Sequence, residues 1–330
     1  MESAKQNFRV QQWVTLLSVV LFAAKIIAYY LTHSLAILTD ALESIVNVLA
    51  GFIGLYSLYI ASKPRDTGHP YGHGKAEFVS AAIEGGLIVA AGILVIYETI
   101  QNIIINNPIH KLDSGLILVG VTALINYGAG FICIKVGKRN KSLALQSTGK
   151  HLQVDTYSTL AIIAGLVIML MTQLYWLDKV IAFAMSLLII YNGYKIVRTS
   201  LAGIMDEADM ALLDTMVKLL NENRRKNWID IHNVRVIKYG SLLHLDCHLT
   251  VPWYLNVNEA HKELDVLNHL IIREFGDAFE MFVHTDGCIP PSSCTVCIKD
   301  DCPVRQHVLV KRLDWTLGNI LSNQKHSAEA

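Results

Sequence analysis

Acidic, amide and imidazole side chains occur within two long apolar stretches of this 330-residue sequence, in a pattern that suits metal binding. In one stretch, Asp40, Glu43 and Asn47 recur at intervals of three and four residues, which places them on one face of a helix. In the other, His151 and Asp155 are one helical turn apart. Carboxylates and imidazoles bind divalent metal ions, and an amide can supply a carbonyl oxygen. Two such faces turned toward each other would hold a divalent cation, whereas the structural alternative is hydrogen bonding between the helices.

A polar segment between two apolar stretches carries a second set of candidate ligands. It runs from Asp66 to Glu77 and reads Asp-Thr-Gly-His-Pro-Tyr-Gly-His-Gly-Lys-Ala-Glu. Glycine and proline favour tight turns, while the aspartate and the histidines could supply metal ligands. An ordinary polar turn would have a similar composition.

Four cysteines lie close together near the C-terminus, at Cys288, Cys294, Cys297 and Cys302. Four thiols at this spacing, which includes a Cys-x-x-Cys pair, suit a tetrahedral Zn²⁺ site or an iron–sulfur centre. Structural Zn²⁺ is the simpler prediction, because a closed thiolate site can fold a short loop. Free thiols or a redox-active pair are the alternatives, while structural disulfides are not expected in a cytosolic segment.

The elements that must position these residues are largely apolar. The chain is 52% apolar and 17% charged, compared with about 25% charged residues in soluble domains. Its net charge of zero argues against nucleic-acid binding. Crossing a hydrocarbon core of about 30 Å takes roughly 20 apolar residues in a helix. Six stretches are long enough, at residues 13–31, 34–62, 78–105, 114–136, 143–170 and 176–201.

We therefore predict a membrane α-helical bundle of six transmembrane helices in residues 1–205, surrounded by the lipid bilayer. The first apolar stretch lacks an obvious cleavage site and is followed at once by another, which argues against a signal peptide. Lysine and arginine in short loops favour the cytoplasmic side. Eleven of them lie on the side of the N-terminus, and two, Lys111 and Lys179, lie on the other. The prediction is a multi-pass protein of the cell (inner) membrane with both termini in the cytoplasm.

The composition changes from about residue 206, where charged residues return and long apolar runs stop. Residues 206–286 are predicted to form a cytosolic α+β domain with the element order αββαβ, ferredoxin-like or metallochaperone-like. The expected elements are a helix at 208–226, strands at 231–239 and 242–251, a helix at 258–275 and a strand at 279–284. Residues 287–330 are expected to form a Cys-rich tail that ends in a helix at 304–321.

The sequence resembles the cation diffusion facilitator family of divalent metal cation transporters. The resemblance rests on Ser34–Ala41 followed by two ligand positions four residues apart, and on His-x-x-x-Asp at His151 and Asp155. It rests further on His-Pro-Tyr-Gly-His-Gly-Lys-Ala-Glu at 69–77, and it covers about residues 8–286. The family fold that it implies is the same six-helix bundle with a cytosolic domain.

The resemblance implies a transport site formed by Glu43, Asn47, His151 and Asp155. Family members usually carry His or Asp at the position of Glu43 and Asp at that of Asn47, so this chain departs from the pattern in its second helix. Asparagine cannot take up a proton as a carboxylate can. Asp40, one turn away, is a candidate accessory ligand.

The resemblance also implies metal binding outside the spans. Asp66 and His73 match a second metal site in the loop. In the cytosolic domain, family members bind metal at the dimer interface, and five positions match that set: His232, His248, His261, His284 and Asp286. Their implied role is metal sensing and stabilisation of a homodimer that is joined through the cytosolic domains.

The predicted function is that of a secondary transporter, not an enzyme, which exports a divalent transition-metal cation from the cytoplasm in exchange for protons. Zn²⁺ is the first choice and Fe²⁺ the second, and Mn²⁺, Co²⁺, Ni²⁺ and Cd²⁺ also fit a shell of nitrogen and oxygen ligands. A histidine must lose its proton to bind metal, so metal and proton can compete at His151.

Two other interpretations remain. A metal-sensing regulatory membrane protein without transport would also use these ligands. A membrane metallohydrolase would need an open coordination position and a general base, and the sequence contains no His-Glu-x-x-His motif.

Overall fold

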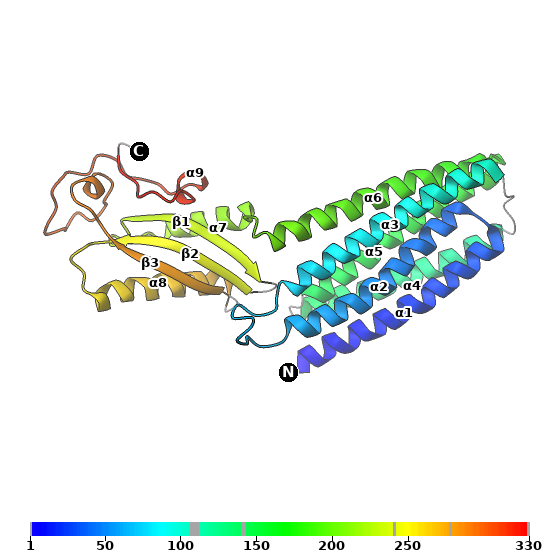
Figure 1. Ribbon diagram of the computed structural model, residues 1–330, viewed down its shortest axis with the longest axis horizontal. Helices are drawn as coiled ribbons and strands as arrows, with labels where there is room; N and C mark the ends of the chain where they lie inside the picture. The colour runs from blue at the N-terminus through cyan, green and yellow to red at the C-terminus, as the bar shows by residue number, and fades with distance from the viewer. Residues whose placement is uncertain (1, 106–111, 140–142, 240–241, 277–278, 329–330) are drawn as a thin grey trace. The chain divides into compact units, whose positions relative to one another are not determined.

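The computed structural model describes residues 2–105, 112–139, 143–239, 242–276 and 279–328. The chain divides into two compact units, one formed by residues 1–60 and 76–201 and the other by residues 61–75 and 202–330. The first unit is helical, and the second contains a small β-sheet (Figure 1).

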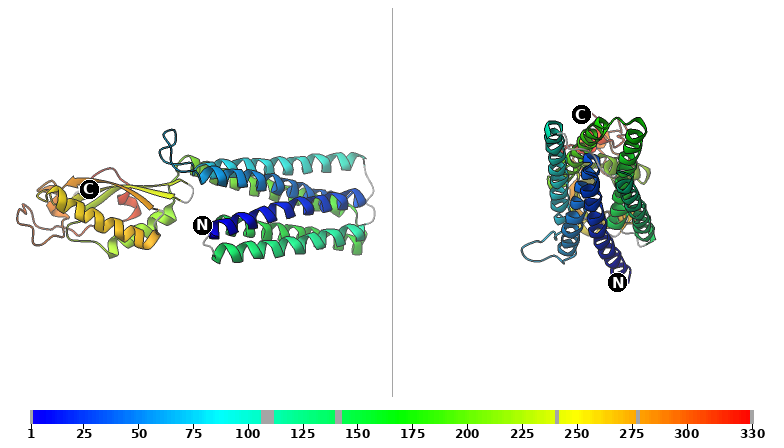
Figure 2. Two further views of the ribbon diagram at one scale, coloured as in Figure 1. Left: turned by 90° about the horizontal axis from the view of Figure 1, so that it is seen from below. Right: turned by 90° about the vertical axis from the view of Figure 1, so that its right-hand side faces the viewer.

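The first unit consists of long helices that run side by side in one bundle (Figures 1 and 2). They are α1 (Glu2–Thr32), α2 (Leu35–Ala61), α3 (Ala76–Ile105), α4 (Leu112–Arg139), α5 (Leu143–Thr172) and α6 (Trp176–Ile204). All six are long and apolar enough to cross a membrane. A helix also pairs its backbone groups internally, as a hydrocarbon environment requires. The predicted six-helix architecture is confirmed.

Two pairs of glycines let neighbouring helices approach closely. A Cβ atom added to Gly149 of α5 would lie 2.6 Å from the carbonyl oxygen of Gly130 in α4. A Cβ atom on Gly85 of α3 would likewise lie 2.9 Å from the carbonyl oxygen of Gly193 in α6. Small residues at such crossings bring helix backbones together in lipid. The first pair holds α5, with His151 two residues further on, against α4.

The start of α2 is bound by a carboxylate from another helix. Asp178 of α6 accepts hydrogen bonds from the backbone N–H groups of Leu35 and Ala36, at 2.8 and 3.3 Å. It also accepts a hydrogen bond from the Ser34 hydroxyl at 2.5 Å. A helix leaves its first N–H groups unpaired, and negative charge there is favourable. This contact fixes the end of the helix that carries Asn47.

The second unit packs helices against a three-stranded sheet. Its elements are α7 (Met210–Glu222), β1 (Asp230–Tyr239), β2 (Leu242–Val251), α8 (Val257–Phe275), β3 (Phe279–Gly287), the 3-10 turn η1 (Ser292–Thr295) and α9 (Leu317–Ile320). The predicted α+β fold with the order αββαβ is confirmed. Both long helices begin at side-chain caps, α7 at Asp209 and α8 at Asn256, where Glu259 completes a capping box.

The register of the sheet aligns three histidines. β1 pairs antiparallel with β2, and β3 lies parallel to β2 on its other side, with α8 as the crossover. His232 lies opposite His248, and His248 lies opposite His284, so the three form a row across the sheet. Residues two apart on a strand share a face, and Asp286 therefore lies on the same face of β3 as His284.

The core of the second unit includes residues of the C-terminal tail. Buried side chains of α7, the sheet and α8 form most of it, among them Met216, Leu249 and Ile271. Trp315 and Ile320 of the tail are buried in the same core. The tail is therefore part of this fold.

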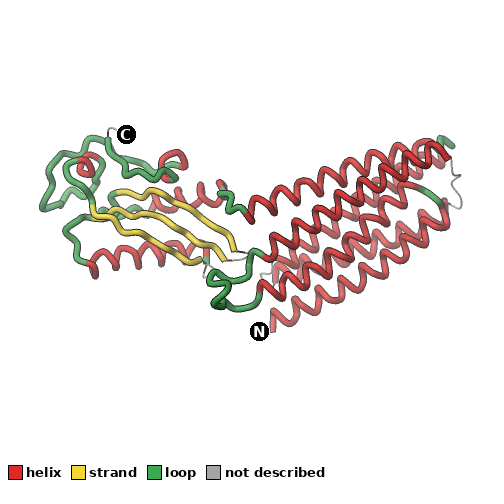
Figure 3. The backbone as a smooth tube through the Cα atoms, viewed as in Figure 1, coloured by secondary structure: helices red, strands yellow, loops and turns green. Residues whose placement is uncertain are grey.

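The prediction of a helix at residues 304–321 is wrong in its length. The helix found there, α9, covers one turn, Leu317–Ile320, and the tail before it is a loop (Figure 3). The backbone N–H groups of Val310 and Lys311 both donate to the carbonyl of Thr295, at 2.8 and 3.2 Å. Arg305 donates to carbonyl groups of the cysteine loop. These backbone N–H groups therefore bind a carbonyl outside the predicted helix, instead of the carbonyl four residues earlier that a helix would provide.

Candidate metal centres

The ligands predicted in the second and fifth spans meet between α2 and α5. His151 Nε2 lies 3.1 Å from Oδ1 of Asn47 and 3.7 Å from Oδ2 of Asp155. The amide nitrogen of Asn47 donates to the same Asp155 oxygen at 2.5 Å. Three of the four predicted ligands thus form one connected group of nitrogen and oxygen donors. Such a mixed set suits a divalent transition metal.

Two glutamates lie around this group. Glu43 is half-buried on α2, and its electrostatic neighbours include Asp155 and Asp40. Glu84 of α3 was not among the predicted ligands, although its Oε1 lies 3.9 Å from His151 Nε2. The sequence did contain a signal for Glu84, namely its position inside an apolar span. A charged residue there costs free energy to bury and commonly has a function.

Asp40, the candidate accessory ligand, takes part in a buried ion pair. Its Oδ2 lies 2.9 Å from Nζ of Lys25 on α1, and both side chains are at most 5% exposed. Its Oδ1 accepts a hydrogen bond from the Thr159 hydroxyl at 2.5 Å. Lys25 therefore balances the charge of Asp40, and both carboxylate oxygens have partners outside the predicted ligand set.

A cavity of about 470 Å³ reaches Asn47 and His151. Its walls come from the N-terminal halves of α1, α3 and α5 and from the C-terminal halves of α2 and α6. Because successive helices of the bundle run in opposite directions, these halves share one end of it. Glu77 and Glu84 add two carboxylates to the lining. The cavity lies between the predicted ligands and the end of the bundle for which the sequence predicts the cytoplasmic side.

The segment 61–75 of the second unit brings three polar side chains together. Asp66 Oδ1 lies 3.1 Å from Nδ1 of His69, and Asp66 Oδ2 lies 3.5 Å from Nε2 of His73. One ligand atom from each residue lies within 4.8 Å of the others. Hydrogen bonds from His69 hold the pKa of Asp66 below its usual range. Asp66 and His73 were predicted as ligands, and the structure places His69 beside them as a further candidate.

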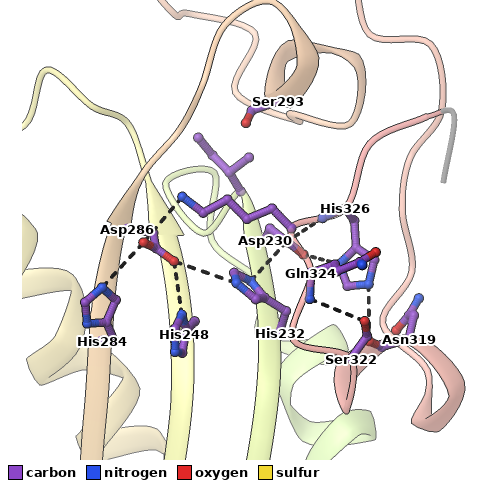
Figure 4. Close-up of polar contacts among 12 residues, drawn as sticks. Asp230, His232, His248, His284, Asp286, Ser293, Asn319, Ser322, Gln324 and His326 are labelled. Carbon is purple, nitrogen blue, oxygen red and sulfur yellow. Dashed lines mark hydrogen bonds and ion pairs between the residues drawn. The ribbon is translucent and has the colours of Figure 1, made fainter.

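Three of the five predicted cytosolic ligands form a further close group on the sheet (Figure 4). Asp286 Oδ2 lies 3.2 Å from Nδ1 of His248 and 3.7 Å from Nε2 of His232. We call His232, His248 and Asp286 the sheet cluster. His284 Nε2 lies 3.5 Å from the other Asp286 oxygen. His261 is exposed on α8 and is not part of this group.

Asp230 of β1 and residues of the C-terminal tail add partners behind the sheet cluster. Asp230 Oδ2 lies 3.3 Å from Nδ1 of His232, and Asp230 Oδ1 lies 2.7 Å from Nδ1 of His326 (Figure 4). Burial alone would raise the pKa of Asp230, but hydrogen bonds from these two histidines outweigh it and hold the pKa well below its usual range. A carboxylate behind a ligand histidine orients its ring. In addition, Lys325 Nζ lies 3.3 Å from Oδ1 of Asp286.

Comparison with known proteins follows the same division of the chain. Residues 13–205 match the family model of the cation efflux transmembrane domain, and residues 210–288 match that of the cytoplasmic domain of cation efflux proteins. The chain belongs to the cation diffusion facilitator family. The predicted family is confirmed, and with it the assignment to multi-pass membrane transporters of cations rather than to enzymes.

Relatives of this facilitator are named as transporters. An uncharacterized transporter of Synechocystis sp. is 27% identical over 75% of this chain and 80% of its own length. The manganese efflux system protein MneP of Bacillus subtilis is 26% identical, over 82% of this chain and 92% of its own length. The cation-efflux pump FieF of Pectobacterium atrosepticum is 25% identical, over 82% and 90%.

Most of the cysteine-rich tail of this facilitator lies beyond the matched domains, because the second family model ends at residue 288. Cys288, Cys294, Cys297 and Cys302 line one small cavity. No three of their sulfur atoms lie within 4.8 Å of one another, unlike the ligand atoms of the two close groups above. Burial raises the pKa of the Cys288 and Cys297 thiols.

Proposed function

We propose that this cation diffusion facilitator exports a divalent transition-metal cation from the cytoplasm in exchange for protons, with Zn²⁺ as the first candidate substrate and Fe²⁺ as the second. The observation that carries the proposal is the meeting of α2 and α5, where His151 Nε2 lies 3.1 Å from Asn47 Oδ1 and 3.7 Å from Asp155 Oδ2. We assign Glu43 as the fourth ligand, since it lies one turn before Asn47 on α2.

The cavity supports loading from the cytoplasm. It reaches Asn47 and His151 from the end of the bundle that carries most of the loop lysines and arginines, and such residues favour the cytoplasmic side. Glu77 and Glu84 in its walls would attract a cation on the way to the ligands. Release on the other side requires the helices to rearrange, so that the site closes toward the cytoplasm and opens toward the opposite side of the membrane.

The chemistry of the ligands supports exchange against protons. The imidazole of His151 binds metal only through a nitrogen without a proton. Asp155 can also be protonated, whereas Asn47 cannot, so one ligand position of this chain contributes no proton. Glu84, 3.9 Å from His151, is placed to receive a proton that the imidazole releases.

The ligand set also supports Mn²⁺ as a competing substrate. Glu43, Asn47 and Asp155 offer oxygen atoms and His151 alone offers nitrogen, and oxygen-rich shells suit Mn²⁺. The relative from Bacillus subtilis is named a manganese efflux protein. A panel of metals in one transport assay separates these candidates.

The test is metal-driven proton movement in vesicles that contain the purified protein and a pH-sensitive dye. Asp155→Ala removes a charged ligand and is expected to abolish the signal, and Asn47→Ala is expected to reduce it strongly. Asn192→Ala is the matched control, because this amide is exposed on α6 and does not line the cavity. Tight metal binding by the wild type without flux of any metal would contradict transport and favour the sensor interpretation.

We extend the proposal to topology and assembly: the cell (inner) membrane, both termini in the cytoplasm, and a homodimer joined through the second unit. The match of residues 210–288 to a cytoplasmic domain model supports this orientation. In the dimer, the sheet cluster would sense cytosolic metal. Labelling of single cysteines at the two termini in intact cells tests the topology, and the mass of the detergent-solubilised protein tests the dimer.

A further inference from the structure

The C-terminal tail contains a second kind of metal-ligand set, distinct from the imidazole and carboxylate groups. We call Cys288, Cys294, Cys297 and Cys302 the cysteine cluster. All four side chains line one cavity of about 10 Å³, which Trp253 and Arg305 help to close. Cys294 and Cys297 are buried, and the other two are half-buried. All four are free thiols.

Backbone hydrogen bonds fix the positions of three of these cysteines. The N–H of Cys288 donates to the carbonyl of Val251 at 2.9 Å, which continues the pairing of β2 with β3. Cys294 lies in η1, and its N–H donates to the carbonyl of Pro291 at 3.0 Å. The N–H of Cys297 in turn donates to the carbonyl of Cys294 at 3.4 Å. A strand end and two successive turns therefore present thiols to the same small space.

Arg305 holds the loop around the cluster. Its guanidinium donates to the carbonyl groups of Cys297 at 3.0 Å and Lys299 at 2.5 Å. It also donates to those of Cys294 at 3.4 Å and His307 at 3.2 Å. One side chain thus sets the curvature of the loop from η1 onward. Its positive charge would also offset part of the negative charge of bound thiolates.

The donor atoms and the size of the cavity point to one particular ligand. Four thiolates form the closed, soft set that structural Zn²⁺ prefers. A space of about 10 Å³ is close to that of a single water-sized sphere, so it suits one ion rather than an iron–sulfur cubane. The sulfur atoms are further apart than in a formed site, and binding would draw each of them to about 2.3 Å from the metal.

We propose that the cysteine cluster binds one resident Zn²⁺ ion, which holds the C-terminal tail on the second unit and is separate from the transported cation. Four thiols would release their protons to water as the ion binds. Zinc binding at this site does not depend on whether the protein transports a cation, or in which direction. Its test is therefore independent of the proposed function.

A structural ion at the cysteine cluster would stabilise the segment of the tail that follows it. Between Cys302 and α9 the described chain contains no helix or strand, and a long segment of this kind in a compact domain needs a stabilising contact. The same segment leads to Trp315, which is buried in the core, and onward to Lys325 and His326 behind the sheet cluster. An ion at the start of the tail would therefore stabilise everything that follows it.

The test is the zinc content of the full-length protein, purified under reducing conditions and treated with a mild chelator that empties histidine and carboxylate sites. We expect one Zn²⁺ per chain to remain in the wild type and to be lost in Cys294→Ser and Cys297→Ser. Cys247→Ala is the matched control, because this buried thiol of β2 does not line the cavity, and it should keep the ion.

Two further measurements keep the test decisive if a serine variant folds poorly. Replacement of the ion by Co²⁺ in the wild type should produce the intense sulfur-to-cobalt charge-transfer absorption of a tetrathiolate site. Removal of the ion by a strong chelator should open the tail after Cys302 to proteolysis. Absence of retained zinc together with four reactive thiols, two disulfides, or iron with acid-labile sulfide would each overturn the proposal.

Discussion

Removal of the buried lysine of α1 should destabilise the helix bundle strongly. Lys25 Nζ lies 2.9 Å from Asp40 Oδ2, and the two side chains are 5% and 1% exposed. In Lys25→Met, Asp40 keeps the hydroxyl of Thr159 as a hydrogen-bond donor but loses its counter-charge. Breaking a buried ion pair from one side typically costs about 3–5 kcal/mol, because the remaining charge stays buried without compensation.

The double variant Lys25→Met/Asp40→Asn removes both charges and supplies the decisive comparison. Replacement of a whole buried pair by neutral groups is often close to neutral in stability. We therefore expect the double variant to recover most of the loss, instead of showing the sum of the two single losses. At about 2–4 °C per kcal/mol for a domain of this size, the single variant should melt roughly 10 °C below the wild type.

The assay is thermal unfolding of the full-length protein in detergent without added metal, followed by tryptophan fluorescence. Lys195→Met is the control, since this lysine of α6 is exposed, and its melting temperature should stay near that of the wild type. A double variant as unstable as the sum of the single variants would refute the reasoning. The double variant should also keep metal transport, whereas a stable double variant without transport would identify Asp40 as a ligand.

Three other changes test the remaining parts of the structure. Lys325→Gln removes a cation beside the sheet cluster and should tighten Zn²⁺ binding there about two- to fivefold, the range of a partly exposed ion pair, in calorimetric titrations. Asp230 raises the pKa of His326 above its ordinary value of about 6.5. The stability that protonated His326 contributes is complete below about pH 6.5 and is lost as pH rises through the raised pKa, so His326→Gln should flatten the fall in melting temperature above that pH. Gly149→Ala forces α5 away from α4, which should cost about 1–3 kcal/mol and weaken metal binding at the transport site.

Each of these changes has a control in the chain. Gly120→Ala should have little effect, because nothing lies within 4 Å of the added Cβ atom. Lys226→Gln breaks an exposed pair with Asp300 and should leave Zn²⁺ binding unchanged. His269→Gln alters an exposed histidine of α8 and should keep the pH profile of the wild type. A control that changes as much as its test variant would show that the effect is not specific to the site.

Much of the architecture could be predicted from the sequence, because the membrane restricts the alternatives. A span must pair its own backbone groups and must be apolar over roughly 20 residues, so composition alone locates six helices. Spacing along a helix likewise places Asn47 on the same face as Glu43, and His151 on the same face as Asp155. The alternation of β1 and β2 indicated the hairpin, whose register then aligns the histidines.

Other features depend on contacts that leave no local pattern. The expected tail helix does not form over residues 304–316, where the backbone N–H groups of Val310 and Lys311 bind the carbonyl of Thr295 in η1. His69 was visible in the loop motif, yet its closeness to Asp66 depends on how that loop turns. The cysteine spacing indicated a metal site, whereas the shared cavity that suits a single ion is visible only in the folded tail.

The sequence by itself determined which segments span the membrane, which candidate ligand types they carry, and which residues lie on the same helix or strand face. These properties depend on composition and on repeats of two to four residues. Tertiary structure alone decided which faces meet. It paired Lys25 with Asp40, placed Glu84 beside His151, and brought Asp230 behind His232. The physical reason is that such contacts join residues far apart in the chain, and packing of whole elements selects them.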